Sequence, residues 1–146
     1  MEINNYDFVW NFCDEFARVE LDGKFGFINK KCEEICELKY DLVWDFCKEF
    51  ARVRLDGKAG YINKKGEEIC EIKYDWVCDF CDEFAQVRLD GKSGFINKKG
   101  KEICELKYDL VCDFCDGFAR VKLNKKYGYI NEKGKEIFEL KYDYVL

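Results

Sequence analysis

The chain repeats itself every 34 residues, and this period constrains its fold more than any single motif does. The dipeptide Tyr-Asp marks each repeat, at positions 6–7, 40–41, 74–75, 108–109 and 142–143. Between these marks the segments are close copies, for example YDLVWDFCKEFARVRLDGKAGYINKKGEEICEIK. A chain of near-identical supersecondary units buries its core by stacking neighbouring units, and it presents one surface several times.

We predict a single repeat domain over residues 1–146, with units 6–39, 40–73, 74–107 and 108–141 and a terminal partial unit 142–146. With 48% hydrophobic and 17% aromatic residues, the composition is that of a folded chain. No stretch approaches the roughly 20 apolar residues that span a bilayer, and no signal peptide is visible at the N-terminus. We expect a cytoplasmic protein without membrane contact.

Glycine spacing favours strands over the helices of tetratricopeptide repeats, which share the 34-residue period. Gly57, Gly60 and Gly66 fall within ten residues, and in a helix they would cost on the order of 2–3 kcal/mol. Residues 50–55, FARVRL, instead alternate apolar and polar side chains, and the Asp-Gly pair that follows is typical of a hairpin turn. The predicted opposite pairs are Leu55–Lys58, Arg54–Ala59, Val53–Gly60, Arg52–Tyr61 and Ala51–Ile62.

A second turn is predicted where Asn63 and Gly66 bracket two lysines, with a positive φ at the glycine. We expect residues 68–72 to form the third strand of the unit. The connector 39–49, KYDLVWDFCKE, has a spacing that also fits a short helix, and we expect it to be extended. The predicted fold is all-β, with four antiparallel meanders stacked as an open twisted array; the alternative is a small closed, propeller-like ring.

The pattern FARVRLDGKAGYINKKGEE…YD resembles the WG repeat, and it covers almost the whole chain four times. The matching residues in the second unit are Phe50, Ala51, Val53, Asp56, Gly57, Lys58, Gly60, Tyr61, Ile62, Asn63 and Gly66. The family's Trp is replaced in the four units by Phe25, Ala59, Ser93 and Tyr127. The resemblance implies a bacterial β-repeat protein, and it carries no catalytic residues to transfer.

The side chains argue against an enzyme. The sequence has no histidine and no threonine, and Ser93 is its one serine, so neither a Ser–His nor a Cys–His nucleophile pair can form. Acidic pairs such as Asp45 with Glu49 recur from unit to unit, whereas an active site normally uses unique residues. We expect the Asp of each Tyr-Asp to accept backbone N–H groups at a turn. We predict no catalytic residue and no cofactor.

Nine of the ten cysteines follow the repeat phase, and Cys32 stands alone. The columns are Cys13, Cys47, Cys81 and Cys115; Cys36, Cys70 and Cys104, continued by Phe138; and Cys78 and Cys112, which replace Trp10 and Trp44. Cysteine that interchanges with Trp and Phe behaves as a hydrophobic filler. We therefore expect reduced, buried thiols and no metal site. The alternatives are structural disulfides and a zinc site formed by the CxxC pairs at 78–81 and 112–115.

Basic and aromatic columns are the best candidates for a binding surface. The candidate residues are Arg18, Arg52, Arg54, Arg88, Arg120, Lys122, Phe27, Tyr61, Phe95 and Tyr129. The leading hypothesis is a repeat protein that binds another protein, as an adaptor or inhibitor. Glycan or cell-wall polymer binding through exposed aromatic rings is one alternative. Nucleic-acid contact along the Arg columns is another, which the net charge of −5 disfavours. The structural alternative is a solvated sheet face.

Cys32 occupies the turn position that Gly66, Gly100 and Gly134 hold in the other units. A side chain in the left-handed region costs about 1 kcal/mol. Cys32→Gly removes this cost, so we expect it to raise the free energy of unfolding. The gain should be small, because glycine also gives the unfolded chain more conformational freedom. Denaturant titration measures the change, and clear destabilisation would mean that Cys32 has a packing role.

Overall fold

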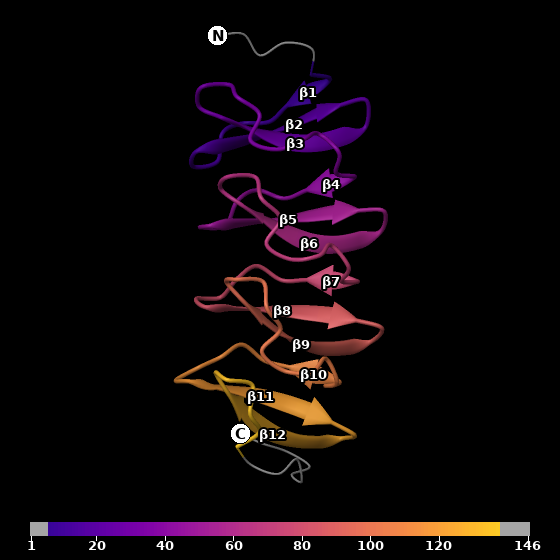
Figure 1. The fold of residues 1–146 in the computed structure, drawn as a ribbon, viewed down its shortest axis with the longest axis vertical. Helices are drawn as coiled ribbons and strands as arrows, with labels where there is room; N and C mark the ends of the chain where they lie inside the picture. The colour runs from indigo at the N-terminus through magenta and orange to yellow at the C-terminus, as the bar shows by residue number, and fades with distance from the viewer. Residues whose placement is uncertain (1–5, 138–146) are drawn as a thin grey trace. The chain divides into compact units, whose positions relative to one another are not determined.

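The computed structural model describes residues 6–137, and all regular secondary structure in this range is β-strand (Figure 1). Twelve strands form four three-stranded antiparallel sheets, one in each predicted unit, and none of the sheets closes into a barrel. The short first strands are β1 (Phe8–Val9), β4 (Leu42–Val43), β7 (Trp76–Val77) and β10 (Leu110–Val111). The hairpins are β2 (Phe16–Leu21) with β3 (Lys24–Asn29), β5 (Phe50–Leu55) with β6 (Lys58–Asn63), β8 (Phe84–Leu89) with β9 (Lys92–Asn97), and β11 (Phe118–Leu123) with β12 (Lys126–Asn131). The predicted all-β meanders are confirmed.

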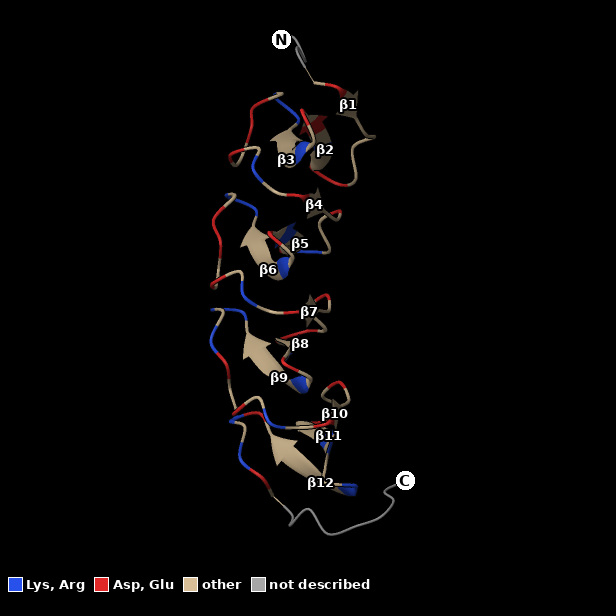
Figure 2. Ribbon diagram, turned by 90° about the vertical axis from the view of Figure 1, so that its right-hand side faces the viewer, with Lys and Arg blue, Asp and Glu red and all other residues tan. Residues whose placement is uncertain are grey.

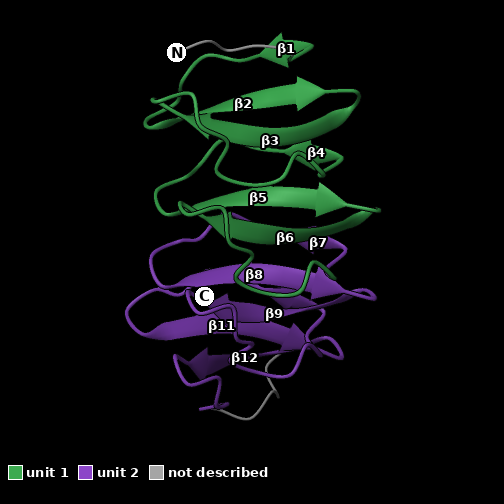
Figure 3. Ribbon diagram, turned by 45° about the horizontal axis from the view of Figure 1, so that its top comes forward, with its two compact units in different colours: residues 1–73 green, residues 74–146 purple. Residues whose placement is uncertain are grey.

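The chain divides into two compact units at a predicted repeat boundary (Figure 3). Unit 1 comprises residues 1–73 and unit 2 comprises residues 74–146. Each contains two of the four meanders. Whether the repeats form an open array, a closed ring or a single domain depends on how the two compact units are placed relative to each other. These three arrangements therefore stay predictions. Phe138 and the partial repeat unit 142–146 lie outside the described residues.

The predicted hairpin register is confirmed at every pair. In the second meander Arg52 lies opposite Tyr61, and the other four predicted pairs have the same register. The turn residues Asp56 and Gly57 both have positive φ, at 52° and 78°. Two successive positive φ values define the turn whose twist matches that of the flanking strands. The Asp-Gly pair therefore fixes which side chains share a face.

The predicted third strand is wrong. Residues 68–72 make a single bridge, between Ile62 and Glu68, and the third strand is instead β4, in which Leu42 and Val43 pair with β5. After the bridge the chain bends, and Ile72 covers Gly60 so closely that a Cβ there would lie 2.9 Å from its Cγ1. The segment must carry the chain to the next meander, so it cannot continue the ladder. The connector is extended, as predicted.

Tyr40 and Tyr108, the second Tyr of the Tyr-Asp motif in each compact unit, each join two meanders. The backbone of Tyr40 pairs with Phe25 of the preceding hairpin, with N···O distances of 2.8 and 3.4 Å. Its buried hydroxyl donates a hydrogen bond to Oε2 of Glu68 in its own repeat, at 2.7 Å. The equivalent donor–acceptor pairs are Tyr6–Glu34, Tyr74–Glu102 and Tyr108–Glu136. Burial, followed by the bond to the glutamate, raises the pKa of Tyr40 and Tyr108 above the ordinary range.

The Asp of the motif accepts a hydrogen bond from the turn of its own hairpin, and Asp41 also binds the preceding turn. Oδ2 of Asp41 accepts the backbone N–H of Asp56 at 2.7 Å, and Oδ1 accepts Nζ of Lys24 from the preceding turn at 2.8 Å. Asp7, Asp75 and Asp109 accept the equivalent backbone N–H groups. The bond from Lys24, and then that from Asp56, lowers the pKa of Asp41. The predicted turn-capping role is confirmed.

Aromatic side chains fill the space between consecutive meanders. The ring of Phe46, in the loop before β5, lies 4.4 Å from the ring of Phe16 and 4.9 Å from that of Phe27. In unit 2, the ring of Phe114 lies 4.5 Å from Phe84 and 4.8 Å from Phe95. The Asp-Phe-Cys loop of each of these two repeats thus covers the hairpin before it.

The turn after each hairpin is built as predicted. Oδ1 of Asn63 accepts the backbone N–H groups of Lys65 and Glu67, and Gly66 has a φ of 78°. In Figure 2, each of these turns, after β3, β6, β9 and β12, shows basic residues in blue followed by acidic residues in red. A Cβ on Gly66 would lie 1.8 Å from the carbonyl oxygen of Ile35 in the preceding repeat. Cys32 has the predicted positive φ, at 63°.

We expect Gly66→Ala to be far more destabilising than Gly57→Ala. Both positions have positive φ, which costs an alanine about 1 kcal/mol, but a Cβ at Gly57 meets nothing within 4 Å. At Gly66 the clash with backbone adds about 1–3 kcal/mol, the usual range for overpacking. Denaturant titration of both variants measures the difference. Equal losses would contradict the close approach of the two repeats.

Replacing Tyr40 and Tyr108 with Phe should make stability less sensitive to alkaline pH. The raised folded-state pKa means that each hydroxyl stabilises fully below about pH 10 and loses this contribution as the pH rises further. We expect the double variant to be about 2 kcal/mol less stable at pH 8, at about 1 kcal/mol per hydrogen bond.

At pH 11 the wild-type protein should lose about 1.4 kcal/mol per tyrosine, since its unfolded state then ionises, and the difference from the double variant should disappear or slightly reverse. Urea titration at both pH values is the measurement. A difference that stays constant would show that the folded-state pKa of these tyrosines is ordinary.

Candidate binding surface

The first basic column comprises Arg18, Arg52 and Arg120, with Gln86 in the third repeat. Its side chains pack within the two compact units. The guanidinium of Arg18 lies 4.9 Å from the centre of the Trp10 ring, and that of Arg52 lies at the same distance from Trp44. Nε of Arg18 also lies 3.0 Å from Oδ1 of Asp45 in the next repeat, as an ion pair without hydrogen-bond geometry. An Arg stacked over an aromatic ring contributes to packing as well as charge. This column therefore helps to hold successive meanders together.

The remaining members of that column follow the same pattern. Gln86 replaces the arginine in the third repeat, and its side-chain amide donates to Oδ1 of Asp113 at 2.7 Å. Arg120 donates to Sγ of Cys112 at 3.6 Å.

The predicted exposure of the four aromatic rings is wrong for three of them. Phe27, Tyr61 and Phe95 are buried, and Tyr129 is half-buried. The hairpin face that carries these rings was expected to face solvent. Phe27 and Phe95 are covered by a phenylalanine from the Asp-Phe-Cys loop of the next repeat. Stacking of meanders within each compact unit thus buries these rings, although other residues of the same face stay exposed.

The second basic column forms the best candidate surface, because each of its members lies directly opposite an exposed apolar residue. Arg54, Arg88 and Lys122 pair across the sheet with the first residues of β4, β7 and β10. Opposite residues in an antiparallel pair share a face. We call these pairs the apolar–basic rows; they are Leu42–Arg54, Trp76–Arg88 and Leu110–Lys122. The equivalent pair in the first repeat is Phe8–Glu20.

The apolar members of the rows are 38%, 49% and 46% exposed, in chain order. Their basic partners are fixed by contacts within their own hairpins. Arg54 donates to the carbonyl oxygen of Gly57 at 3.0 Å, and Arg88 donates to Oγ of Ser93 at 2.8 Å. Nζ of Lys122 lies 5.2 Å from the centre of the Tyr127 ring. The rows therefore present apolar and cationic groups at set positions.

Sequence reasoning found the basic half of the rows and missed the apolar half. Two apolar residues follow Tyr-Asp in each repeat, and in an extended connector only one of them can face the core. Val43, Val77 and Val111 take the buried position. Assigning the connector to a strand would have identified Leu42 and Trp76 as exposed.

All ten cysteines are free thiols, and none of them is fully buried. The prediction of buried thiols is therefore wrong: Cys13, Cys81 and Cys115 are exposed. Cys36 and Cys104 are partly buried against the cores, and this burial raises the pKa of each thiol. Within residues 6–137 no three His, Cys, Asp or Glu side chains come together as a metal-binding group.

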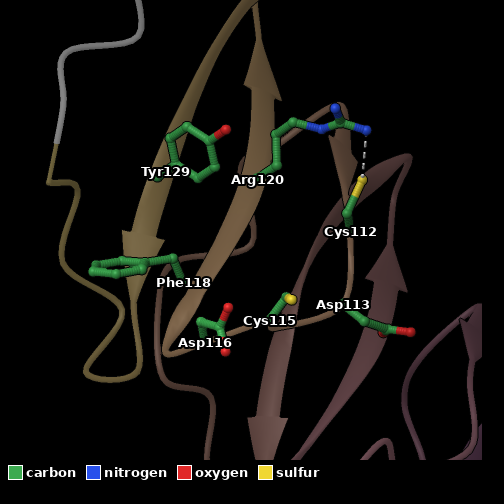
Figure 4. A pocket seen from close by; sticks show the side chains of 7 residues that line it. All are labelled: Cys112, Asp113, Cys115, Asp116, Phe118, Arg120 and Tyr129. Carbon is green, nitrogen blue, oxygen red and sulfur yellow. Dashed lines mark hydrogen bonds between the residues drawn. The ribbon is translucent and has the colours of Figure 1, made fainter. Parts of the chain in front are cut away.

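A hollow of about 550 Å³ lies beside the last hairpin (Figure 4). Phe118 and Arg120 reach it from β11, and Tyr129 reaches it from β12. The loop before β11 completes the lining with Cys112, Asp113, Cys115 and Asp116. Phe118 is exposed here, whereas its equivalent in the first repeat, Phe16, is buried.

The chain matches the family model described as "WG containing repeat" five times, over residues 5–25, 25–58, 60–92, 94–127 and 127–146. A comparison with curated proteins gave no match. Residues 6–137 form no helix long and apolar enough to cross a membrane.

Solved structures of β-propeller-like Hsv2 proteins are similar in fold. "KlHsv2 with loop 6CD replaced by a Gly-Ser linker" is 12% identical, with a TM-score of 0.51 over 94% of this chain and 52% of that chain. Kluyveromyces lactis Hsv2p is 15% identical, with a TM-score of 0.44 over 84% and 44%. The chain spans about half the length of these proteins, and at such low identity the likeness concerns the fold alone.

Proposed function

Because this chain is a member of the WG containing repeat family, we propose that it is a non-enzymatic repeat protein that binds another protein through its repeated surface, as an adaptor or an inhibitor. The apolar–basic rows are the observation that supports this proposal. Contiguous exposed apolar groups mark interaction sites, and Trp and Arg are enriched among the residues that contribute most to protein binding. Trp76 beside Arg88 is such a combination.

The chemistry of the rows favours a partner that combines apolar and acidic side chains. In unit 2 both rows carry a cation, Arg88 and Lys122. Carboxylates opposite them would steer association and fix its register, while Trp76 and Leu110 would lose exposed apolar area. The first repeat has Glu20 at the equivalent position, so we place the main contact on the later repeats.

Two alternatives are weaker on the same observations. Glycan binding was based on exposed rings, and Phe27, Tyr61 and Phe95 are buried. Nucleic-acid binding was based on the Arg columns, and Arg18 and Arg52 stack on tryptophans in a protein of net charge −5. The ten free thiols fit a reducing cytoplasm, which we propose as the location.

We expect Trp76→Ala with Leu110→Ala to abolish capture of the partner in a pull-down from the native cells. Loss of two exposed apolar contacts should weaken the purified complex at least tenfold, which corresponds to about 1.4 kcal/mol. Ile137→Ala is the matched control, since Ile137 is 39% exposed and lies outside the rows.

Two charge-reversal variants test the contribution of the basic residues in the rows. Arg88→Glu should weaken binding and reduce its salt dependence, whereas Lys99→Glu, at an exposed position outside the rows, should do neither. Capture that is unchanged in the row variants, or that nuclease treatment abolishes, would contradict the proposal.

A further inference from the structure

The four repeats differ from one another mainly at the apolar–basic rows. When the repeat units are aligned, three of their 34 columns contain three or more residue types, and every other column contains at most two. Two of the three variable columns hold the members of the rows. The third holds the residues that lie opposite the basic members on β6, β9 and β12, which we call the facing residues; they are Ala59, Ser93 and Tyr127.

Solvent exposure does not explain where the repeats vary. One lysine column, in the turns after the hairpins, is exposed in every repeat and never varies; its members are Lys31, Lys65, Lys99 and Lys133. The basic members of the rows are half-buried, and the facing residues Ala59 and Ser93 are 2% and 6% exposed. Neutral drift would change the exposed lysines first, because substitutions on the surface have little effect on stability. Variation along one strip of each sheet instead indicates that each row is adjusted separately.

The rows stay exposed beside a neighbouring repeat. Within unit 2, Leu110 follows another repeat and is 46% exposed, and Trp76 precedes one and is 49% exposed. Leu42 likewise follows a repeat within unit 1 and is 38% exposed. A repeat stacked on either side therefore leaves this column open to a partner.

The facing residue determines how the cation of its row is held. Oγ of Ser93 accepts a hydrogen bond from one terminal nitrogen of Arg88, at 2.8 Å. Nζ of Lys122 instead lies 5.2 Å from the centre of the Tyr127 ring. A guanidinium fixed in this way keeps other N–H groups for a carboxylate in a planar, directional arrangement, whereas an ammonium acts as a point charge. The two rows therefore offer different sites to an acidic group.

The two rows of unit 2 follow one another along the same strip. The backbone of Ser93 pairs with Tyr108 of the next repeat, with N···O distances of 2.7 and 3.3 Å. Leu110, the first residue of the next row, lies two residues after Tyr108. One extended chain that crosses Ser93 thus meets the first row and then the second.

Resting on the function proposed above, we propose that the two rows of unit 2 bind one extended, acidic segment of the partner, with one carboxylate at each row. The facing residues Ser93 and Tyr127 are positioning residues that determine which acidic side chain each row accepts. The segment is acidic because the cations of both rows bond only neutral groups of their own hairpins, a hydroxyl and a ring. Trp76 and Leu110 pack against apolar side chains beside its carboxylates.

Selection from a phage-displayed library of random peptides tests this inference. The purified chain should enrich peptides that combine acidic and apolar residues. Leu110→Trp, Lys122→Arg and Tyr127→Ser together turn the row of the fourth repeat into a copy of the row of the third, so both rows should then select the same acidic side chain.

The control also copies the third repeat into the fourth, but outside the rows. Asn124→Asp with Lys125→Gly restores the Asp-Gly turn of the other hairpins and should leave the enriched sequences unchanged. Matching circular dichroism spectra exclude unfolding as the cause of any change in either variant.

Single variants of Ser93 test its positioning role. The readout is the ratio of affinities for an enriched peptide and for its copy with amides in place of the carboxylates. Ser93→Ala should lower this ratio about twofold to tenfold, the effect of one hydrogen bond. Ser93→Thr keeps the hydroxyl and should keep the ratio, which a merely structural role would not require.

Three results would overturn the inference: no enrichment of peptides, enriched peptides without acidic residues, or a row exchange that leaves the preference unchanged. Capture of a partner that depends on Trp76 and Leu110 would in each case still support the proposed function, through a folded surface of that partner. Loss of this dependence would instead contradict the proposed function itself, so the two failures are distinguishable.

Discussion

The packing of each compact unit depends on the junction that one Tyr-Asp pair, Tyr40-Asp41 or Tyr108-Asp109, makes between its two repeats. Within unit 1, Tyr40 pairs its backbone with the preceding hairpin and bonds Glu68 of its own repeat through a buried hydroxyl. Asp41 connects the turns of both hairpins through Lys24 and Asp56. A three-stranded meander of this size cannot bury its own apolar face. The junction supplies the neighbour that makes each meander stable.

Stacking also decides which surfaces remain for binding. Because the loop of the next repeat covers the hairpin before it, rings such as Phe27 become core residues. Within residues 6–137, large exposed apolar side chains include those on the first strand of each meander, such as Trp76 and Leu110. These first strands are the surface to which we assign partner binding.

The sequence predicted local structure better than it predicted packing. The Asp-Gly turn identified the register of the first three hairpins, and Asn63 and Gly66 identified a positive φ correctly. In the fourth hairpin Asn124 and Lys125 take the place of Asp-Gly, also with positive φ. The third strand was misplaced because residues 68–72 and Leu42–Val43 are both short apolar segments. Choosing between them requires the position of the next meander, which no local pattern encodes.

The sequence by itself determined the repeat, the all-β class, the hairpins and the family, since these follow from spacing and turn chemistry within 34 residues. Only the tertiary structure decided which side chains face solvent. Arg52 and Arg54 look equivalent in the sequence, yet Arg52 stacks on Trp44 while Arg54 lies beside the exposed Leu42. Alternation along a strand predicts which face of the sheet a residue lies on. It does not predict whether a neighbouring repeat covers that face, and this contact between repeats decides which side chains are exposed.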